Sequence, residues 1–442
     1  MRPLQSLTLE AIVDLLATTF STVADVRASE QLRYSLQDTL LSGFAVMFFQ
    51  HPSLLQFQRA MAKKRQRCNL QTIFGVHAVP SDTQMREILD EVKPEVLRGV
   101  LPQLWEKVRR VGWRGRFTTR LPSGRHQGTY YTVALDGSEY FRSTQIQCPH
   151  CLRQTEPQER IHYSHKIVGA TVVRAGSHQV LPLDVEEVCN ATVESAPQDC
   201  ELTAGKRLIT RLRQEHPQMA LIMIGDDLYS HVPFVAQLQQ LRQHFVLVAK
   251  PASHPTLLAA VAAAEGTAQS QTGQWHEGSG ARQRTSTYRF VYHVPLSVEG
   301  AGRVTYVEVW EQNAKGEQLY HNSWITDLDV DAANVAVVVQ IGRTRWKIEN
   351  EQFNVHKNHG YDLTHNYGHG QHHLSMVFYL LNLLAYVTHT VLALGDRLYQ
   401  RCRAQESRRE LWNALRTLVN RILVTSWGAL LTVYLDDTDA SP

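Results

Sequence analysis

The chain has 442 residues, of which 43% are hydrophobic and 20% are charged, with a formal net charge of +3. This balance excludes a disordered polypeptide and predicts a globular protein of two or three domains. The charge is too small by itself to indicate a nucleic-acid partner, and six cysteines at irregular spacing do not suggest a disulfide framework. Reduced cysteines and the lack of a signal peptide at residues 1–4 indicate a cytoplasmic protein.

The first quarter of the chain is predicted to be helical and basic. Apolar residues recur at three- and four-residue spacing from about residue 7 to residue 110, and Ser81 is a predicted N-cap. A basic run at residues 63–67 is typical of either a solvated loop or a DNA-backbone contact. A second basic block at residues 109–116, with Arg120 and Arg125 beyond it, combines arginines with an aromatic residue, which favours phosphate contact and stacking.

The middle of the chain predicts an α/β fold with a mixed sheet covered by helices on both faces. Three strand-like runs precede a helix, and strands then alternate with helices. The runs are residues 130–135, 161–173, 179–185, 220–225 and 245–250, with helices at about 200–214 and after Pro233. This order of elements is that of an RNase H-like fold.

Residues 251 to about 330 predict a β-rich insertion. A short helix at 257–264 and a polar, turn-rich break at 266–280 precede alternating strands at 287–292 and 304–310. Two tryptophans in this part of the chain, Trp310 and Trp324, suit either core packing or stacking on an unpaired base.

Residues 374–394 form an apolar run that is long enough to cross a membrane. Asn382, Tyr386 and His389 within it predict a buried core helix of a soluble protein instead. Seven arginines between Arg397 and Arg421 then mark a C-terminal helix whose basic face is either solvated or in contact with DNA.

Three acidic residues stand out against this pattern. Asp136 and Asp226 each follow a predicted buried strand, although an aspartate at a strand end is more often a turn or cap residue. Glu349 lies on a predicted helix with Arg345 one turn before it, whereas Glu351 points about 200° away. Carboxylates from two strand ends and one helix suit a pair of Mg²⁺ or Mn²⁺ ions.

With these residues the chain resembles the DDE transposases of bacterial insertion sequences, specifically the group with the signature Tyr-x2-Arg-x3-Glu-x6-Lys. Arg345 and Glu349 match the signature, whereas Gly342 replaces the tyrosine and His356 replaces the lysine, with Lys357 following. Further landmarks in the same order are the segments 136–141, 199–201, 225–229 and 365–370.

The resemblance implies a two-metal enzyme that cleaves phosphodiester bonds at the ends of an insertion sequence and joins the 3′-hydroxyl to target DNA. Asp136 would bridge two Mg²⁺ ions, for which Mn²⁺ would substitute, and Asp226 and Glu349 would each hold one. Asp227 competes with Asp226 for its role. Arg345 and either Lys357 or His356 would hold phosphates.

The partners implied are double-stranded DNA, as terminal inverted repeats and as target, and a second copy of the chain on paired ends. The resemblance also favours DNA contact by the N-terminal helical region and a bacterial, nucleoid-associated location. Two alternatives remain: a catalytically silent DNA-binding protein derived from a transposase, and an RNase H-like nuclease without strand transfer.

A second metal site is predicted at Cys148 and Cys151, whose spacing is that of a zinc knuckle. His162 and His165 follow, but on one regular strand they point to opposite faces, and His165 is the favoured ligand. The alternative is a reduced cysteine pair in a surface turn. The histidines from His356 to His373 lack a fixed helical spacing and are predicted to contact DNA or cap helices.

These observations divide the chain into five segments. They are a helical DNA-binding region at 1–125, the first part of the core at 126–250 with a zinc hairpin at 148–165, the β-rich insertion at 251–332, the second part of the core at 333–394 and a helical C-terminal region at 395–442.

Overall fold

A single mixed sheet runs through the computed structural model, which describes residues 7–25, 27, 32–157, 160–190, 197–298 and 302–439. Residues 1–4, where no signal peptide is expected, lie outside this range. The strands are β1 Thr118–Leu121, β2 Gly128–Ser143, β3 Leu152–Thr155, β4 Ile161–Val173, β5 Leu181–Val188, β6 Leu221–Gly225, β7 His244–Val248, β8 Ser270–Glu277, β9 Arg284–Pro295, β10 Arg303–Asn313 and β11 Gln318–Thr326.

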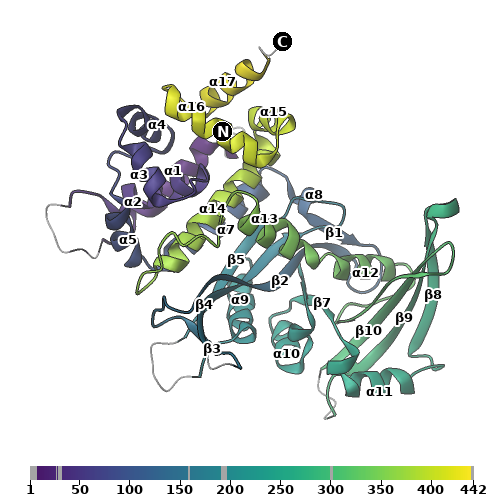
Figure 1. The fold of residues 1–442 in the computed structure, drawn as a ribbon. Helices are drawn as coiled ribbons and strands as arrows, with labels where there is room; N and C mark the ends of the chain where they lie inside the picture. The colour runs from purple at the N-terminus through teal and green to yellow at the C-terminus, as the bar shows by residue number, and fades with distance from the viewer. Residues whose placement is uncertain are drawn as a thin grey trace.

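The helices lie before, between and after these strands (Figure 1). They are α1 Leu9–Ser21, α2 Leu36–Phe48, α3 Leu54–Met61, α4 Lys64–Phe74, α5 Asp82–Asp90, α6 Pro94–Arg98, α7 Val100–Arg110, α8 Arg114–Phe117, α9 Glu201–Glu215, α10 Val232–Gln240, α11 Pro255–Ala263, α12 Val335–Arg343, α13 Asn354–Asn358, α14 Leu374–Gly395, α15 Arg397–Gln405, α16 Arg408–Arg421 and α17 Trp427–Asp439. A π-helix, Ile348–Phe353, lies between α12 and α13.

The part of the sheet that carries the acidic residues has the order β5-β4-β2-β6-β7. Strands β2, β6 and β7 run parallel, and β4 is antiparallel to both β2 and β5. The parallel strands are buried apolar runs, as expected for strands that are covered on both faces.

Helices cover both faces of this part of the sheet. Asp136 of β2 is paired with Gly169 of β4, and the space above Gly169 is filled by Phe353 of the π-helix. The next residue, Gly137, faces the opposite side, where Glu201 of α9 lies against it. The prediction of an α/β fold with a mixed sheet flanked by helices is therefore confirmed.

The β-rich segment extends the same sheet. Strand β11 pairs antiparallel with β7, and β10, β9 and β8 follow in order. Strand β8 lies within residues 266–280, which the sequence predicted to be a turn-rich break. The strand was missed because its residues are polar and mostly exposed, so it has no apolar alternation. Trp324 is fully buried, which excludes it from base stacking, and Trp310 stacks on His321 within the sheet.

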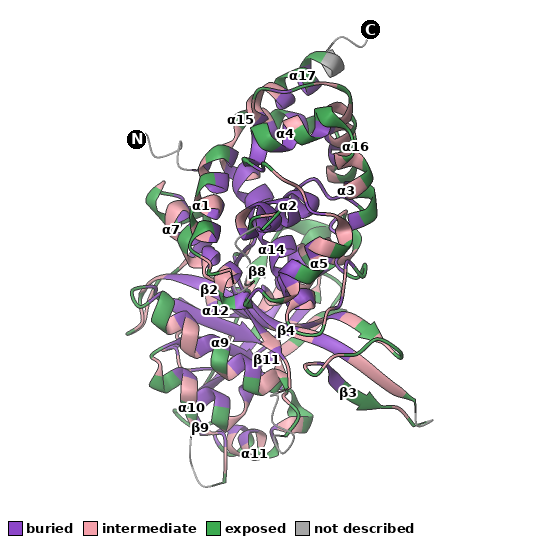
Figure 2. Ribbon diagram, turned by 90° about the vertical axis from the view of Figure 1, so that its left-hand side faces the viewer, coloured by how far each residue is buried: buried purple, intermediate pink, exposed green. Residues whose placement is uncertain are grey.

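The N-terminal and C-terminal helices pack together around α14. Figure 2 shows α2 and α14 buried among them. Among the described residues, α14 is the one helix long and apolar enough to cross a membrane, and 94% of its apolar window is buried within the protein. This burial confirms the prediction of a core helix.

Two C-terminal arginines take part in this packing. Arg416 of α16 donates hydrogen bonds to the carbonyl oxygens of Phe49 and Gln50, and the guanidinium of Arg408 lies over the ring of Tyr361. These two side chains therefore join helices and do not belong to a free basic face. The seven arginines from Arg397 to Arg421 are also divided between two helices, α15 and α16, where the sequence predicted one.

Candidate active site

Asp136 lies within β2 and not at its end. The parallel pairing of β2 with β6 stops at Ala134 opposite Ile224, but β2 continues with β4 as far as Ser143. The prediction of a strand end was wrong because the apolar run ends where β6 ends, while the antiparallel hairpin continues. Asp136 therefore emerges at the carboxyl edge of the parallel strands.

Asp226 lies at the same edge. It follows Gly225, the last residue of β6, and its position two residues beyond Ile224 matches that of Asp136 beyond Ala134. Its side chain accepts a hydrogen bond of 3.0 Å from the backbone N–H of Leu228 and caps the 3-10 helix Asp227–Ser230. Among the described residues, none donates a hydrogen bond to the second oxygen of this carboxylate, Oδ2.

The neighbouring Asp227 is engaged elsewhere. Its carboxylate accepts hydrogen bonds from the N–H of Lys250 at 2.6 Å and the hydroxyl of Ser253 at 2.5 Å, and lies 3.3 Å from Nε2 of His254. With His231, Asp227 and His254 form a second group whose ligand atoms lie within 4.8 Å of one another. These contacts favour Asp226 over Asp227 as the residue that completes the acidic site.

Glu349 reaches Asp136 from the π-helix. Nη1 of Arg345 contacts Oε1 of Glu349 and lies 3.7 Å from Oδ2 of Asp136, so one guanidinium joins the two carboxylates. Burial and the negative charge of Glu349 raise the pKa of Asp136 to about 7, and Arg345 opposes this shift. The sequence predicted an α-helix here, whereas the i→i+5 turn of a π-helix is a feature often found at functional sites.

Glu351 points to a different part of the surface. Its carboxylate lies 3.0 Å from Nδ1 of His178, and Lys347, four residues before it, donates to the carbonyl oxygen of Ser177. Because Glu351 contacts His178 while Glu349 is joined to Asp136 through Arg345, the contacts favour Glu349 for the acidic site.

The packing of Trp324 explains why Gly342 replaces the signature tyrosine. A Cβ atom at residue 342 would lie 2.5 Å from the indole Nε1 of Trp324, well inside van der Waals contact. The buried indole therefore fills the space that a side chain at this position would need.

His356 is excluded from the phosphate contact that the sequence left open for it. Its ring is fully buried, and burial together with the charge of Arg408 lowers its pKa to about 3, so the ring is uncharged. The next residue, Lys357, lines an open groove together with Asp136 and Glu349. Of these two neighbouring residues, Lys357 is therefore the one whose side chain lines the groove beside the carboxylates.

Glu201 is a fourth carboxylate at this edge. It accepts a hydrogen bond of 2.9 Å from the hydroxyl of Tyr229, and burial and the nearby charge of Asp226 raise its pKa. A side chain at Gly137 would collide with the Glu201 carboxylate, so the glycine permits this close approach. Glu201 belongs to the landmark segment 199–201, but its approach from the opposite face of the sheet has no local sequence pattern that would have marked it as part of the site.

A further cluster of potential metal ligands, separate from the acidic groove, contains Cys148, Cys151, His165 and His369. Nε2 of His165 lies 3.4 Å from the Sγ atoms of both cysteines, whereas His162 lies 3.1 Å from Glu156. His369 was missed because it lies far along the chain, in a glycine-flanked segment without helical spacing.

Several residues of the basic segments are exposed. They are Lys63, Lys64, Arg65, Arg67, Arg114, Arg116, Arg120 and Arg125. Arg109 and Arg110 of the second block are paired with Glu106 at 2.7 and 2.8 Å, which reduces the positive charge they offer to a partner.

The raised pKa of Asp136 predicts that the metal-free protein loses stability as pH rises. An aspartate in an unfolded chain has a pKa of about 3.9, whereas that of folded Asp136 is about 7. Between these values the folded state binds the additional proton, so the free energy of unfolding should fall with rising pH across this window.

Thermal denaturation in the presence of a chelator, at about pH 5 and about pH 8, tests whether the free energy of unfolding falls as pH rises. Asp136→Asn carries no titrating group at this position, so its melting temperature should fall less between the two pH values. An equal change in melting temperature between the two pH values for the wild type and the variant would contradict the raised pKa of Asp136.

Comparison of the chain with protein-family models and with curated proteins finds no match.

Proposed function

We propose that this chain is a DDE transposase with an RNase H-like core, which cleaves the ends of an insertion sequence and joins them to target DNA. The observation that carries the proposal is the position of Asp136, Asp226 and Glu349. Asp136 and Asp226 lie at equivalent positions beyond the pairing of two adjacent parallel strands, and Glu349 of the π-helix is joined to Asp136 through Arg345. The strand order β5-β4-β2-β6-β7 supports the RNase H-like assignment.

The residues at this edge fit divalent cations. Every donor is a carboxylate oxygen, the ligand that Mg²⁺ and Mn²⁺ prefer, and the raised pKa of Asp136 reflects burial and crowding of negative charge that a cation would relieve. Asp136, Asp226 and Glu349 would hold the ions. Bound in this way, the ions would activate the attacking oxygen and stabilise the leaving oxygen.

The chain itself would position the phosphate. Arg345 now neutralises Asp136 and Glu349, and it would turn to the phosphate oxygens when cations take over that role. Lys357 lines the same groove and would contact a second oxygen.

The proposed reaction has two displacements at phosphorus. A water molecule forms a bond to the phosphorus at the transposon end and the 3′-oxygen leaves as a hydroxyl. This hydroxyl then attacks a target phosphodiester, and the target's own 3′-oxygen leaves. Both steps exchange one P–O bond for another and need no redox partner.

The proposed partners are double-stranded DNA, as terminal inverted repeats and as target, and a second copy of the chain on paired ends, in the bacterial cytoplasm. The exposed lysines and arginines of residues 63–67 and 114–125 supply positive charge for phosphate contacts.

Labelled DNA that carries the sequences flanking the gene, mixed with protein, Mg²⁺ and a supercoiled plasmid, tests the proposal. We expect products in which a labelled end is joined to the plasmid, with a short target duplication. Nicks without joined products would support the nuclease alternative. Binding to the ends without any cleavage would support the silent DNA-binding protein.

A further inference from the structure

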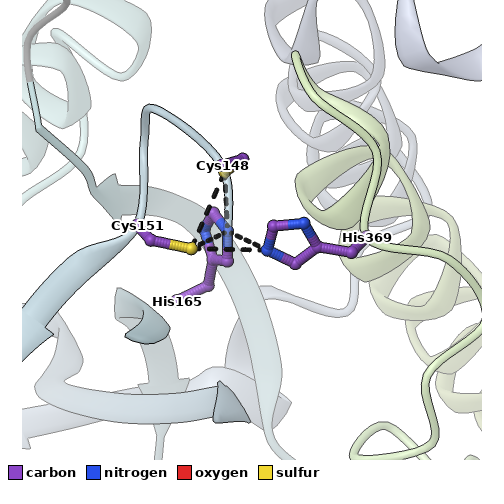
Figure 3. Close-up of side chains that lie close together, drawn as sticks. All are labelled: Cys148, Cys151, His165 and His369. Carbon is purple, nitrogen blue, oxygen red and sulfur yellow. Dashed lines mark hydrogen bonds between the residues drawn. The ribbon is translucent and has the colours of Figure 1, made fainter. Parts of the chain in front are cut away.

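Four potential metal ligands from distant parts of the chain point to a common centre (Figure 3). Cys148 and Cys151 lie between β2 and β3, His165 lies on β4, and His369 lies in the segment before α14. Their ligand atoms all lie within 4.8 Å of one another.

The separations between these atoms match the edges of a zinc-centred tetrahedron. Zn–S bonds of about 2.3 Å and Zn–N bonds of about 2.05 Å give edges of about 3.8 Å between sulfurs, about 3.6 Å between sulfur and nitrogen and about 3.3 Å between nitrogens. The Sγ atoms of Cys148 and Cys151 are 3.7 Å apart, and the Nε2 atoms of His165 and His369 are 3.1 Å apart. Three sulfur–nitrogen separations are 3.4, 3.4 and 3.3 Å.

Both imidazoles are oriented by their outer nitrogens. Nδ1 of His165 lies 3.2 Å from a carboxylate oxygen of Glu187, and Nδ1 of His369 lies 3.0 Å from the carbonyl oxygen of Gly370. Each Nδ1–H therefore has an acceptor, which leaves the Nε2 lone pairs directed at the centre. Such carboxylate or carbonyl partners are typical of histidines that bind zinc.

The site is largely closed to solvent, because three of its four ligands are buried and Cys148 is half-buried. Cys151, His165 and His369 are buried, with 4%, 2% and 8% of their surface exposed. Two thiolates would neutralise the charge of one Zn²⁺, and four protein ligands leave no position for a substrate, which is the arrangement of structural zinc sites.

We propose that Cys148, Cys151, His165 and His369 bind one structural Zn²⁺, which fastens the β2–β4 hairpin to the segment before α14. The ion would thus connect two parts of the protein. Strands β2 and β4 carry and flank Asp136, and α14 is the buried helix around which the N-terminal and C-terminal helices pack. Without the ion, the hairpin beyond Ser143 and the chain around His369 would lose their mutual attachment. This proposal stands independently of the proposed function.

Metal analysis of protein purified without chelator should find about one zinc per chain. His369→Ala should lose most of the zinc and unfold at a lower temperature, because the binding energy of a structural site contributes to folding. Two matched controls, His162→Ala on the same strand and the exposed His372→Ala, should retain the zinc.

Wild-type protein without zinc, or His369→Ala with full zinc content, would overturn the proposal. If His369→Ala does not fold, replacement of the metal in the wild type by Co²⁺ provides the test. Tetrahedral cobalt with two thiolates and two imidazoles should give intense visible absorption bands with sulfur-to-metal charge transfer. Weak octahedral bands without charge transfer would contradict the assignment.

Discussion

Asp136→Ala and Asp226→Ala should each reduce Mg²⁺-dependent cleavage of end DNA by at least about a hundredfold, since each removes a carboxylate that would hold a catalytic ion. DNA binding should be unchanged, because neither residue belongs to the exposed basic segments. Cleavage is followed on labelled ends and binding by gel shift. Asp14→Ala, an exposed carboxylate on α1, serves as the charge-matched control and should cleave normally.

Full cleavage by either variant would show that the carboxylates at this edge of the sheet do not form the active site. Loss of both cleavage and DNA binding in folded protein would also contradict the separation between the acidic groove and the basic segments.

Glu349→Gln should eliminate cleavage by a comparable factor, whereas Glu351→Gln should leave it nearly unchanged. The two residues share the same π-helix, but Glu349 joins Asp136 through Arg345 while Glu351 pairs with exposed His178. A partly exposed pair of this kind stabilises a protein by at most about 1 kcal/mol, so both variants should fold. Cleavage rates normalised to folded protein measure the difference.

An active Glu349→Gln variant beside an inactive, folded Glu351→Gln variant would reverse the assignment. Because the two substitutions are chemically identical and two residues apart, each is the control for the other.

The part of the fold that depends on local patterns was predictable. Buried apolar runs marked the parallel strands, and polar residues within residues 374–394 distinguished a core helix from a membrane span. The sequence also placed Glu349 and Arg345 one turn apart, and in the structure these two side chains are in contact.

The contributions that join distant elements were not predictable. His369 lies 218 residues from Cys151, and no periodicity relates a loop histidine to a cysteine turn. Glu201 approaches through the space left by Gly137, a contact that appears only when the sheet is formed. The ring of His356 packs against Tyr361 and against Tyr386 of α14, contacts that residue spacing alone does not indicate.

Localised oxidative cleavage of the protein backbone by Fe²⁺ in place of Mg²⁺ tests the central claim most directly. Iron bound by Asp136, Asp226 and Glu349 should cut the chain beside all three residues in the presence of ascorbate and peroxide. Excess Mg²⁺ and the Asp136→Ala substitution should both suppress these cuts. Cuts confined to the neighbourhood of Asp227, His231 and His254, or none near Asp136 and Glu349, would contradict an acidic metal centre at this edge of the sheet.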